Sequence, residues 1–219
     1  MRIAVVNSKG GVGKTTSSVY LAAAAAARGL TVELVDMDRQ QSLTTWLDEA
    51  APLPEGVTYR RANANSAGRD SGADVVILDA PPGDPKDIDA AAEIADFIVI
   101  PTLPGLLNDE RTIATWKYLN QFRWPAGVLL VGIDPRRVVA RQTRQRIEES
   151  GANVAVLSSW IPNRTDVVGA AGTWPKDLHG YDAVLAEITE KVHANKHNTH
   201  ALTYSTTDKP VSRLFRRRV

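Results

Sequence analysis

Seven hydrophobic segments recur along the chain, and the spacing between most of them leaves room for a helix. Most are near-continuous runs of apolar residues rich in valine and isoleucine, such as VVILD and IAVV. Runs of this kind are typical of strands that are covered on both faces of a sheet. The predicted strands are residues 2–7, 31–36, 57–61, 74–79, 96–100, 127–133 and 153–158.

Helices are predicted in the intervals between these strands. Gly29 and Gly151 follow the first and fifth of them, and glycine commonly ends a helix. The predicted helices are residues 14–28, 42–50, 85–94, 107–122, 139–150 and 182–195. This alternation predicts an α/β fold, a doubly wound, mostly parallel sheet with helices on both faces, in a single domain over residues 1–195.

Polar segments follow several of the predicted strands at their carboxyl ends. They are residues 7–16, 36–41, 79–83 and 101–105. Ligands of doubly wound sheets bind beyond the carboxyl ends of the strands. We therefore expect the chemistry of the protein at this edge of the sheet.

Composition narrows the classes of function. A length of 219 residues suits one domain with a full core. The chain has no cysteine, which excludes disulfides, thiolate metal sites and cysteine nucleophiles. No apolar run reaches the roughly 18 residues of a membrane span, and the N-terminus enters a strand without a signal peptide. A cytoplasmic location is therefore expected.

The charge of the chain is unevenly distributed. Residues 196–219 contain six basic residues and one acidic residue, a net charge of +5. Because the whole chain carries +1, residues 1–195 carry −4. We expect residues 196–219 to form a basic, flexible tail, with a linker at 197–210.

Residues 8–16 read SKGGVGKTT, directly after the first predicted strand and at the start of the first helix. Glycines in such a loop let backbone N–H groups converge on phosphate oxygens, and the helix N-terminus favours an anion. Lys14 is expected on the β- and γ-phosphates, Thr15 on magnesium and Thr16 near the α-phosphate. The loop therefore predicts binding of ATP and Mg²⁺. The predicted contacts are Lys9, Gly10, Gly11, Val12, Gly13, Lys14, Thr15 and Thr16.

Three aspartates lie at the ends of predicted strands. Asp79 follows VVIL and is expected to hold magnesium directly or through water. Asp36 and Asp38 follow VELV, and they are expected to support the magnesium shell and to orient the attacking water, respectively. The alternative for Asp36 is a helix N-cap or a turn. Magnesium ligands are thus predicted at Thr15, Asp36 and Asp79.

Three motifs together, SKGGVGKTT, DMDRQQS and VILDAPPG, resemble the ParA/MinD family of deviant Walker ATPases. The resemblance extends from residue 1 to about 195 and includes IPTLPG at 100–105 and WIPNRTD at 160–166. Because the chain begins directly at the phosphate loop, it is most similar to small plasmid-partition ParA proteins, which lack an N-terminal helix-turn-helix domain.

This resemblance implies a P-loop ATPase that forms a sandwich homodimer with ATP and hydrolyses it slowly until a partner stimulates it. Lys9 matches the signature lysine that reaches the partner's nucleotide, although an exposed lysine without a function is the alternative. Asp38 matches the acid linked to hydrolysis. The catalytic residues implied are Lys9, Lys14 and Asp38, and Pro162, Asn163 and Arg164 are expected beside the adenine.

Arginines are concentrated in residues 136–146, which contain no acidic residue. Arg137, Arg141 and Arg144 are spaced for one face of a helix. Such a face suits contacts with the phosphate backbone of DNA that read no sequence. The alternative is a solvated helix surface partly balanced by Glu148 and Glu149. Relatives in the resembled family bind nonspecific DNA as ATP dimers, which implies association with the nucleoid.

Two functions remain open at this stage. The first is a partition ATPase that positions plasmid or chromosomal DNA with a ParB-like adaptor. The second is a MinD-like regulator that cycles on a membrane or positions another cargo. In the latter case the spacing of Val211, Leu214 and Phe215 is compatible with a short basic amphipathic helix at the end of the tail. For this tail, a solvated segment ranks first, DNA contact second and membrane contact last. Metal-cluster ATPases of this type need cysteines, which the chain lacks.

Overall fold

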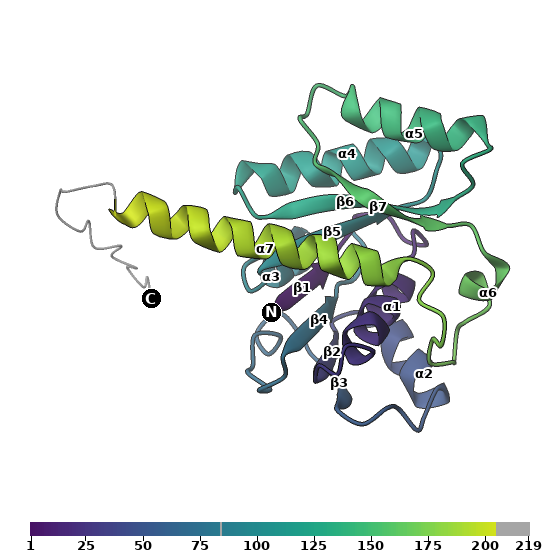
Figure 1. Cartoon of the computed structure of the whole chain (residues 1–219), viewed down its shortest axis with the longest axis vertical. Coiled ribbons are helices and arrows are strands. Elements are labelled where there is room, and N and C mark those ends of the chain that lie inside the picture. The colour runs from purple at the N-terminus through teal and green to yellow at the C-terminus, as the bar shows by residue number, and fades with distance from the viewer. Residues whose placement is uncertain (84, 205–219) are drawn as a thin grey trace.

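The computed structural model describes residues 1–83 and 85–204, which form a three-layer α/β structure around one sheet (Figure 1). All the paired strands run parallel, in the order β3-β2-β4-β1-β5-β6-β7. The strands are β1 (Arg2–Val5), β2 (Val32–Asp36), β3 (Val57–Arg61), β4 (Val75–Asp79), β5 (Phe97–Thr102), β6 (Ala126–Ile133) and β7 (Val156–Pro162). The predicted doubly wound fold and single domain are confirmed.

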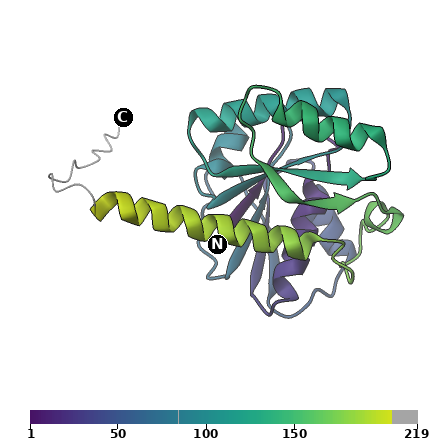
Figure 2. The same cartoon turned by 45° about the horizontal axis from the view of Figure 1, so that its top comes forward.

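Helices cover both faces of this sheet. The helices are α1 (Lys14–Ala26), α2 (Ser42–Glu49), α3 (Pro85–Ala92), α4 (Leu106–Gln121), α5 (Val138–Glu148), α6 (Thr165–Val168) and α7 (Tyr181–Tyr204). Helices α1, α2 and α7 share one hydrophobic core with the sheet, and α3, α4 and α5 share the other. In Figures 1 and 2 the α4–α5 pair and the α1–α7 pair lie on opposite faces.

Alternation along the strands explains the two cores. In β1, Ile3 and Val5 belong to the core under α1, while Ala4 belongs to the core under α3 and α4. Successive side chains of a strand point to opposite faces, so a continuous apolar run supplies both layers at once. The alanines of α1, a residue of high helix propensity, let this helix pack closely on the sheet.

The last strand was predicted wrongly at 153–158. It runs instead from Val156 to Pro162, because Asn153 adopts a left-handed backbone conformation (φ 49°) that keeps it out of a strand. Leu157 and Ile161 are buried, whereas Trp160 is partly exposed on this edge strand. The shift has a functional consequence, since it brings the carboxyl end of β7 to Pro162.

The prediction of a linker from residue 197 is also wrong over its first part, because α7 continues to Tyr204. No glycine or proline interrupts residues 182–204, so nothing in the sequence stops the helix. Figure 2 shows α7 extending past the edge of the sheet. The rest of the tail, with Leu214 and Phe215, lies outside the described residues. Within the described part of the chain, no helix is long and apolar enough to cross a membrane.

The chain start and the far part of α7 meet at the amino ends of the strands. Asp96, just before β5, accepts a hydrogen bond from the backbone N–H of Arg2 (2.8 Å) and pairs with Lys196 (3.3 Å). The α-amino group of Met1 donates to the carbonyl of Asp74 (2.7 Å), just before β4. Helix α7 begins at the opposite, carboxyl edge, where Tyr181 is buried.

Candidate nucleotide-binding site

The segment between β1 and α1 is a tight loop at the carboxyl edge of the sheet. Gly11 and Gly13 have positive φ angles of 72° and 86°, which other residues rarely adopt. Gly13 is the N-cap of α1 and supplies no side-chain cap, so the first N–H groups of the helix remain available to a ligand. The glycines therefore give a loop in which no side chain of the N-cap residue occupies the backbone N–H groups at the start of α1.

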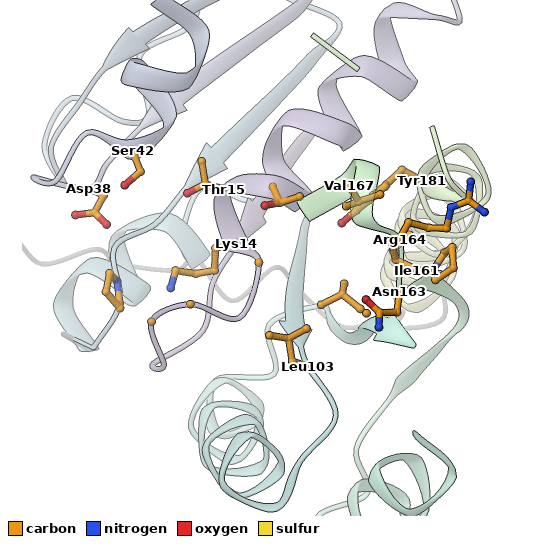
Figure 3. A pocket seen from close by; sticks show the side chains of 18 residues that line it. Lys14, Thr15, Asp38, Ser42, Leu103, Ile161, Asn163, Arg164, Val167 and Tyr181 are labelled. Carbon is orange, nitrogen blue, oxygen red and sulfur yellow. The ribbon is translucent and has the colours of Figure 1, made fainter. Parts of the chain in front are cut away.

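This loop forms one wall of a cavity of about 500 Å³. Figure 3 shows Lys14 and Thr15 on one side, near Asp38 and Ser42, and Asn163 and Arg164 on the other side. The lining residues are Gly10, Gly11, Gly13, Lys14, Thr15, Thr16, Asp38, Ser42, Pro82, Leu103, Val131, Gly132, Ile161, Pro162, Asn163, Arg164, Val167 and Tyr181. The cavity thus joins the phosphate loop with the carboxyl ends of β6 and β7.

Lys14 is almost fully buried, with 8% of its surface exposed. Its ammonium donates to the backbone carbonyl of Lys9 (3.0 Å), which holds it across the loop. Burial lowers the pKa of Lys14, while the carboxylates of Asp79 and Asp38 favour its charged form. The structure therefore holds the ammonium of Lys14 against the backbone of the loop.

Asp79 ends β4 beneath this loop and is 2% exposed. Its two carboxylate oxygens accept hydrogen bonds from the hydroxyls of Thr15 (2.8 Å) and Ser18 (2.9 Å). Burial raises the pKa of Asp79 to about 7 despite these bonds. A hydroxyl and a carboxylate in contact suit magnesium, which takes few protein oxygens and completes its shell with phosphates and water. The pair formed by Thr15 and Asp79 fits a bound Mg²⁺.

Asp36 has a different environment, although it ends the neighbouring strand. One carboxylate oxygen accepts from both the N–H (2.8 Å) and the hydroxyl (2.7 Å) of Thr44, and the other accepts from the N–H of Asp38 (3.1 Å). Asp36 therefore accepts hydrogen bonds from the first turn of α2, although the N-cap of that helix is Gln41. Both of its oxygens already have partners, and the cavity lining does not include it.

Asp38 is the carboxylate that lines the cavity beyond the loop. One of its oxygens accepts from the N–H of Gln40 (2.9 Å), which orders the turn before α2. Arg39 and Gln40 are exposed at this turn. Asp38 is thus placed at the same end of the cavity as Lys14 and Thr15, with its backbone fixed by Asp36.

Lys9 lies on the outer half of the loop and is half-buried. Its N–H donates to Asn7 (3.0 Å), and its ammonium donates to the side-chain oxygen of Asn108, on the first turn of α4. Lys9 does not line the cavity of its own chain. The ammonium is therefore held beside the loop rather than inside it.

The far side of the cavity is where Pro162, Asn163 and Arg164 were expected, and all three line it. Arg164 also pairs with Asp166 (3.4 Å). Sequence reasoning missed the apolar walls formed by Leu103, Val131, Ile161, Val167 and Tyr181. The first three belong to or follow runs that read as ordinary strands, so no local signal distinguished them. Val12, predicted as a contact, is buried and does not line the cavity.

The three arginines predicted as one face have three different surroundings. Arg137 is the N-cap of α5 and lies 3.8 Å from Asp134, and Arg141 is exposed and has no ion pair among the described residues. Arg144 donates to the carbonyl of Leu157 (2.9 Å) and to Glu148 (3.0 Å). Arg144 is therefore bonded to β7, whereas Arg136, Arg137 and Arg141 of the same segment are exposed.

Comparison with known proteins agrees with this geometry. Residues 3–173 match the family described as the CobQ/CobB/MinD/ParA nucleotide binding domain. The chain is 35% identical to the maintenance of carboxysome distribution protein A of Gloeobacter kilaueensis over 158 residues, which cover 68% of this chain and 71% of that protein. It is 31% identical to the chromosome-partitioning ATPase Soj of Thermus thermophilus over 189 residues, which cover 67% and 75%. Among solved structures, the MinD cell division protein of Aquifex aeolicus superposes with a TM-score of 0.68 at 17% identity, covering 88% of this chain and 96% of that one.

Proposed function

Because the chain belongs to the CobQ/CobB/MinD/ParA nucleotide-binding family, we propose that it is an ATPase that dimerises with ATP, binds nonspecific DNA as a dimer, and positions DNA with a ParB-like adaptor. Membership of this family of P-loop ATPases implies ATP hydrolysis. The observation that carries the proposal is that Lys14 and Thr15 line a cavity large enough for a nucleotide, while the carboxylate of Asp79 is bonded to the hydroxyl of Thr15.

The residues of the site divide the work of phosphoryl transfer between them. The loop N–H groups and Lys14 bind the phosphates and neutralise their charge. Thr15 and Asp79 would hold magnesium, which when bound supplies positive charge at the transferring phosphate. Asp38 accepts a hydrogen bond from the attacking water and orients it. Asp36 acts one step removed, by holding the N–H of Asp38.

Support for dimerisation comes from the difference between the two lysines. Lys14 is buried and committed to its own loop, while Lys9 lies outside the cavity with its ammonium on Asn108. A cation in that position does not reach the nucleotide of its own chain but is available to a nucleotide bound by a second copy facing the same edge. A second copy would thereby supply transition-state charge, as an arginine finger does.

For DNA contact, the support comes from exposed arginines beside the same edge. Arg136 and Arg137 precede α5, Arg141 follows on its first turn, and all three are exposed. A dimer would present this cluster twice, and phosphate contacts add up along a duplex. Arg144 is left out of the proposed DNA surface because its guanidinium is engaged with Leu157 and Glu148.

Size-exclusion chromatography of the wild type and of Asp38→Ala tests the proposal. We expect monomers with ADP, dimers with ATP and Mg²⁺, and a larger dimer fraction for Asp38→Ala because hydrolysis no longer empties the site. Repeating the runs with a DNA duplex of unrelated sequence should shift the ATP dimers alone. A monomer under every nucleotide condition would refute the dimer, and a dimer that ignores DNA would refute the DNA-binding part.

A second candidate is the positioning of a cargo other than DNA. The observation that favours it is the 35% identity to a protein named for the maintenance of carboxysome distribution. Both candidates share the nucleotide cycle and differ in the adaptor. Adding anionic liposomes to the same chromatography separates the membrane-cycling form of this alternative, which requires ATP-dependent co-migration with lipid.

A further inference from the structure

Helix α4 presents a row of polar side chains to the first half of the phosphate loop. Asn108, Thr112 and Thr115 are spaced four and three residues apart, so they lie on one face of the helix. We name them the α4 polar row. Asn108 accepts a hydrogen bond from the ammonium of Lys9, Thr112 accepts one from the side-chain amide of Asn7 (3.3 Å), and Thr115 accepts one from the N–H of Ser8 (3.3 Å).

Three of the side chains that make these contacts are buried. Asn7, Thr112 and Thr115 are almost completely buried in the layer between the sheet and α4. A buried hydroxyl or amide without a partner costs free energy, so each of these groups depends on the others. The side-chain amide of Asn7 also donates to the carbonyl of Pro101 (2.9 Å), which fixes its orientation.

Ser8 is the position at which the loop departs from the ordinary P-loop template, which has glycine there. Its hydroxyl lies 3.0 Å from the hydroxyl of Thr115, in addition to the bond from its N–H. The departure thus has a structural counterpart on α4: a serine in the loop is matched by a threonine on the helix. Because Lys9 directly follows Ser8, the bonds between Ser8 and Thr115 also hold the backbone that leads into Lys9.

The α4 polar row is itself held in place by α5. Arg146 donates to the buried carboxylate of Asp109 (2.6 Å), and the N–H of Gly105 donates to the hydroxyl of Thr143 (3.1 Å). Asp109 follows Asn108 in the first turn of α4, and Gly105 is the N-cap of this helix. The turn that carries Asn108 is therefore held by α5.

The second half of the loop differs in its contacts with α4. Lys14 bonds to the backbone carbonyl of Lys9 (3.0 Å) and Thr15 bonds to Asp79, and within the described residues no hydrogen bond joins Gly10–Thr16 to α4. The half that carries Lys9 is therefore bonded to α4 through its side chains, whereas the half that binds phosphate has no such bond and meets Lys9 only at its backbone carbonyl.

From this division we propose that the α4 polar row consists of positioning residues for Lys9, which act on its use and not on the binding of the nucleotide. The role given to Lys9 rests on the proposed function. A lysine that must reach the nucleotide of a second copy needs a defined starting point, and misplacement by about 1 Å can lower a rate by about a hundredfold.

The test uses Thr115→Val, which keeps the shape of the side chain and removes its hydroxyl. Thr115→Ser, which keeps the hydroxyl, is the conservative variant. Asn120→Ala, on the exposed side of α4, is the control. ADP affinity should stay within about twofold of the wild type in all three, while the turnover of ATP at saturation falls about tenfold in Thr115→Val alone. A loss of ADP affinity in proportion to turnover would overturn the proposal in favour of a general loss of structure.

A double-mutant cycle asks whether the effect passes through Lys9. In a Lys9→Ala background, Thr115→Val should lower turnover no further, because its target is gone. An undiminished additional loss would show that Thr115 acts elsewhere and would overturn the proposal. Thermal melting of each variant checks that the fold is intact.

A readout that does not depend on turnover separates this proposal from the proposed function. Labelling with an amine-reactive reagent, followed by mass spectrometry of the nucleotide-free protein, should show faster modification of Lys9 in Asn108→Ala than in the wild type or in Asn120→Ala. An unchanged labelling rate would overturn the positioning role. Absence of ATP-dependent dimers in the wild type would instead overturn the proposed function and leave the labelling result standing.

Discussion

Two regions of this molecule concentrate positive charge, and they use it in opposite ways. In the phosphate loop, Lys14 is buried beside the carboxylate of Asp79 and points into a cavity. On α5, the arginines diverge, since Arg146 bonds to α4, Arg144 bonds to β7 and Arg141 faces solvent. The role of a cation therefore depends on which groups surround its charge. Charge spacing along a helix does not reveal those groups.

We expect the largest effect on nucleotide affinity from a substitution of Lys14. Lys14→Ala removes the charge that we propose binds the phosphates, and we expect nucleotide affinity to fall about 1000-fold, since each charge-assisted bond contributes roughly 1.5–3 kcal/mol. Isothermal titration with ADP measures this loss. Lys9→Ala is the matched control, because Lys9 lies outside the cavity and its removal should leave ADP affinity within about twofold.

Asp38→Ala tests the carboxylate that lines the same cavity as Lys14. We expect ATP and ADP to bind normally, while turnover falls about 100-fold, because general-base and water-orienting groups contribute roughly 10²- to 10⁴-fold. A phosphate-release assay at saturating ATP measures the turnover. Normal turnover in this variant would mean that the water is oriented by another group.

Arg144→Ala tests whether Arg144, which bonds to Leu157 and Glu148, stabilises the fold instead of binding DNA. The variant loses the bond to the carbonyl of Leu157, and we expect the free energy of unfolding to fall by about 1 kcal/mol and the melting temperature by about 2–4 °C. DNA affinity should change little. If DNA binding weakens sharply while the melting temperature stays constant, the division drawn between Arg144 and Arg141 is wrong.

Arg141→Ala is the complementary change, with the smallest expected effect. Removing one phosphate contact should weaken DNA binding by the ATP-bound protein about three- to tenfold and reduce the slope of log affinity against log salt by about one. Fluorescence anisotropy over a salt series measures both. The melting temperature should not change, because Arg141 makes no ion pair among the described residues.

The fold was predictable from the sequence because its signals are local and repeated. Apolar runs specified the strands, glycines specified helix ends, and SKGGVGKTT specified a loop between a strand and a helix. The strand at the edge of the sheet was misplaced, because the prediction began it at Asn153, a residue that readily adopts the left-handed backbone angle it has here.

The polar residues of the candidate site could be predicted on both sides of the cavity, with Pro162, Asn163 and Arg164 named from the family resemblance, whereas its apolar walls could not. Lys14, Thr15 and Asp79 follow from spacing, whereas Asp36 and Asp38 look equivalent in sequence and differ because Thr44 lies beside one of them. Thr112 and Thr115 could not have been singled out, since a threonine in a helix carries no signal until its partner in the fold is known.

The amino ends of the strands, where Met1 contacts Asp74 and Asp96 contacts both Arg2 and Lys196, have a practical consequence. A fluorophore, affinity tag or surface tether attached at Met1 lies at the edge of the sheet opposite the candidate nucleotide-binding cavity. Such a label leaves the loop, α4 and α5 uncovered. Met1 is therefore the attachment point for single-molecule recordings that test the proposed contacts with nucleotide, DNA and a second copy.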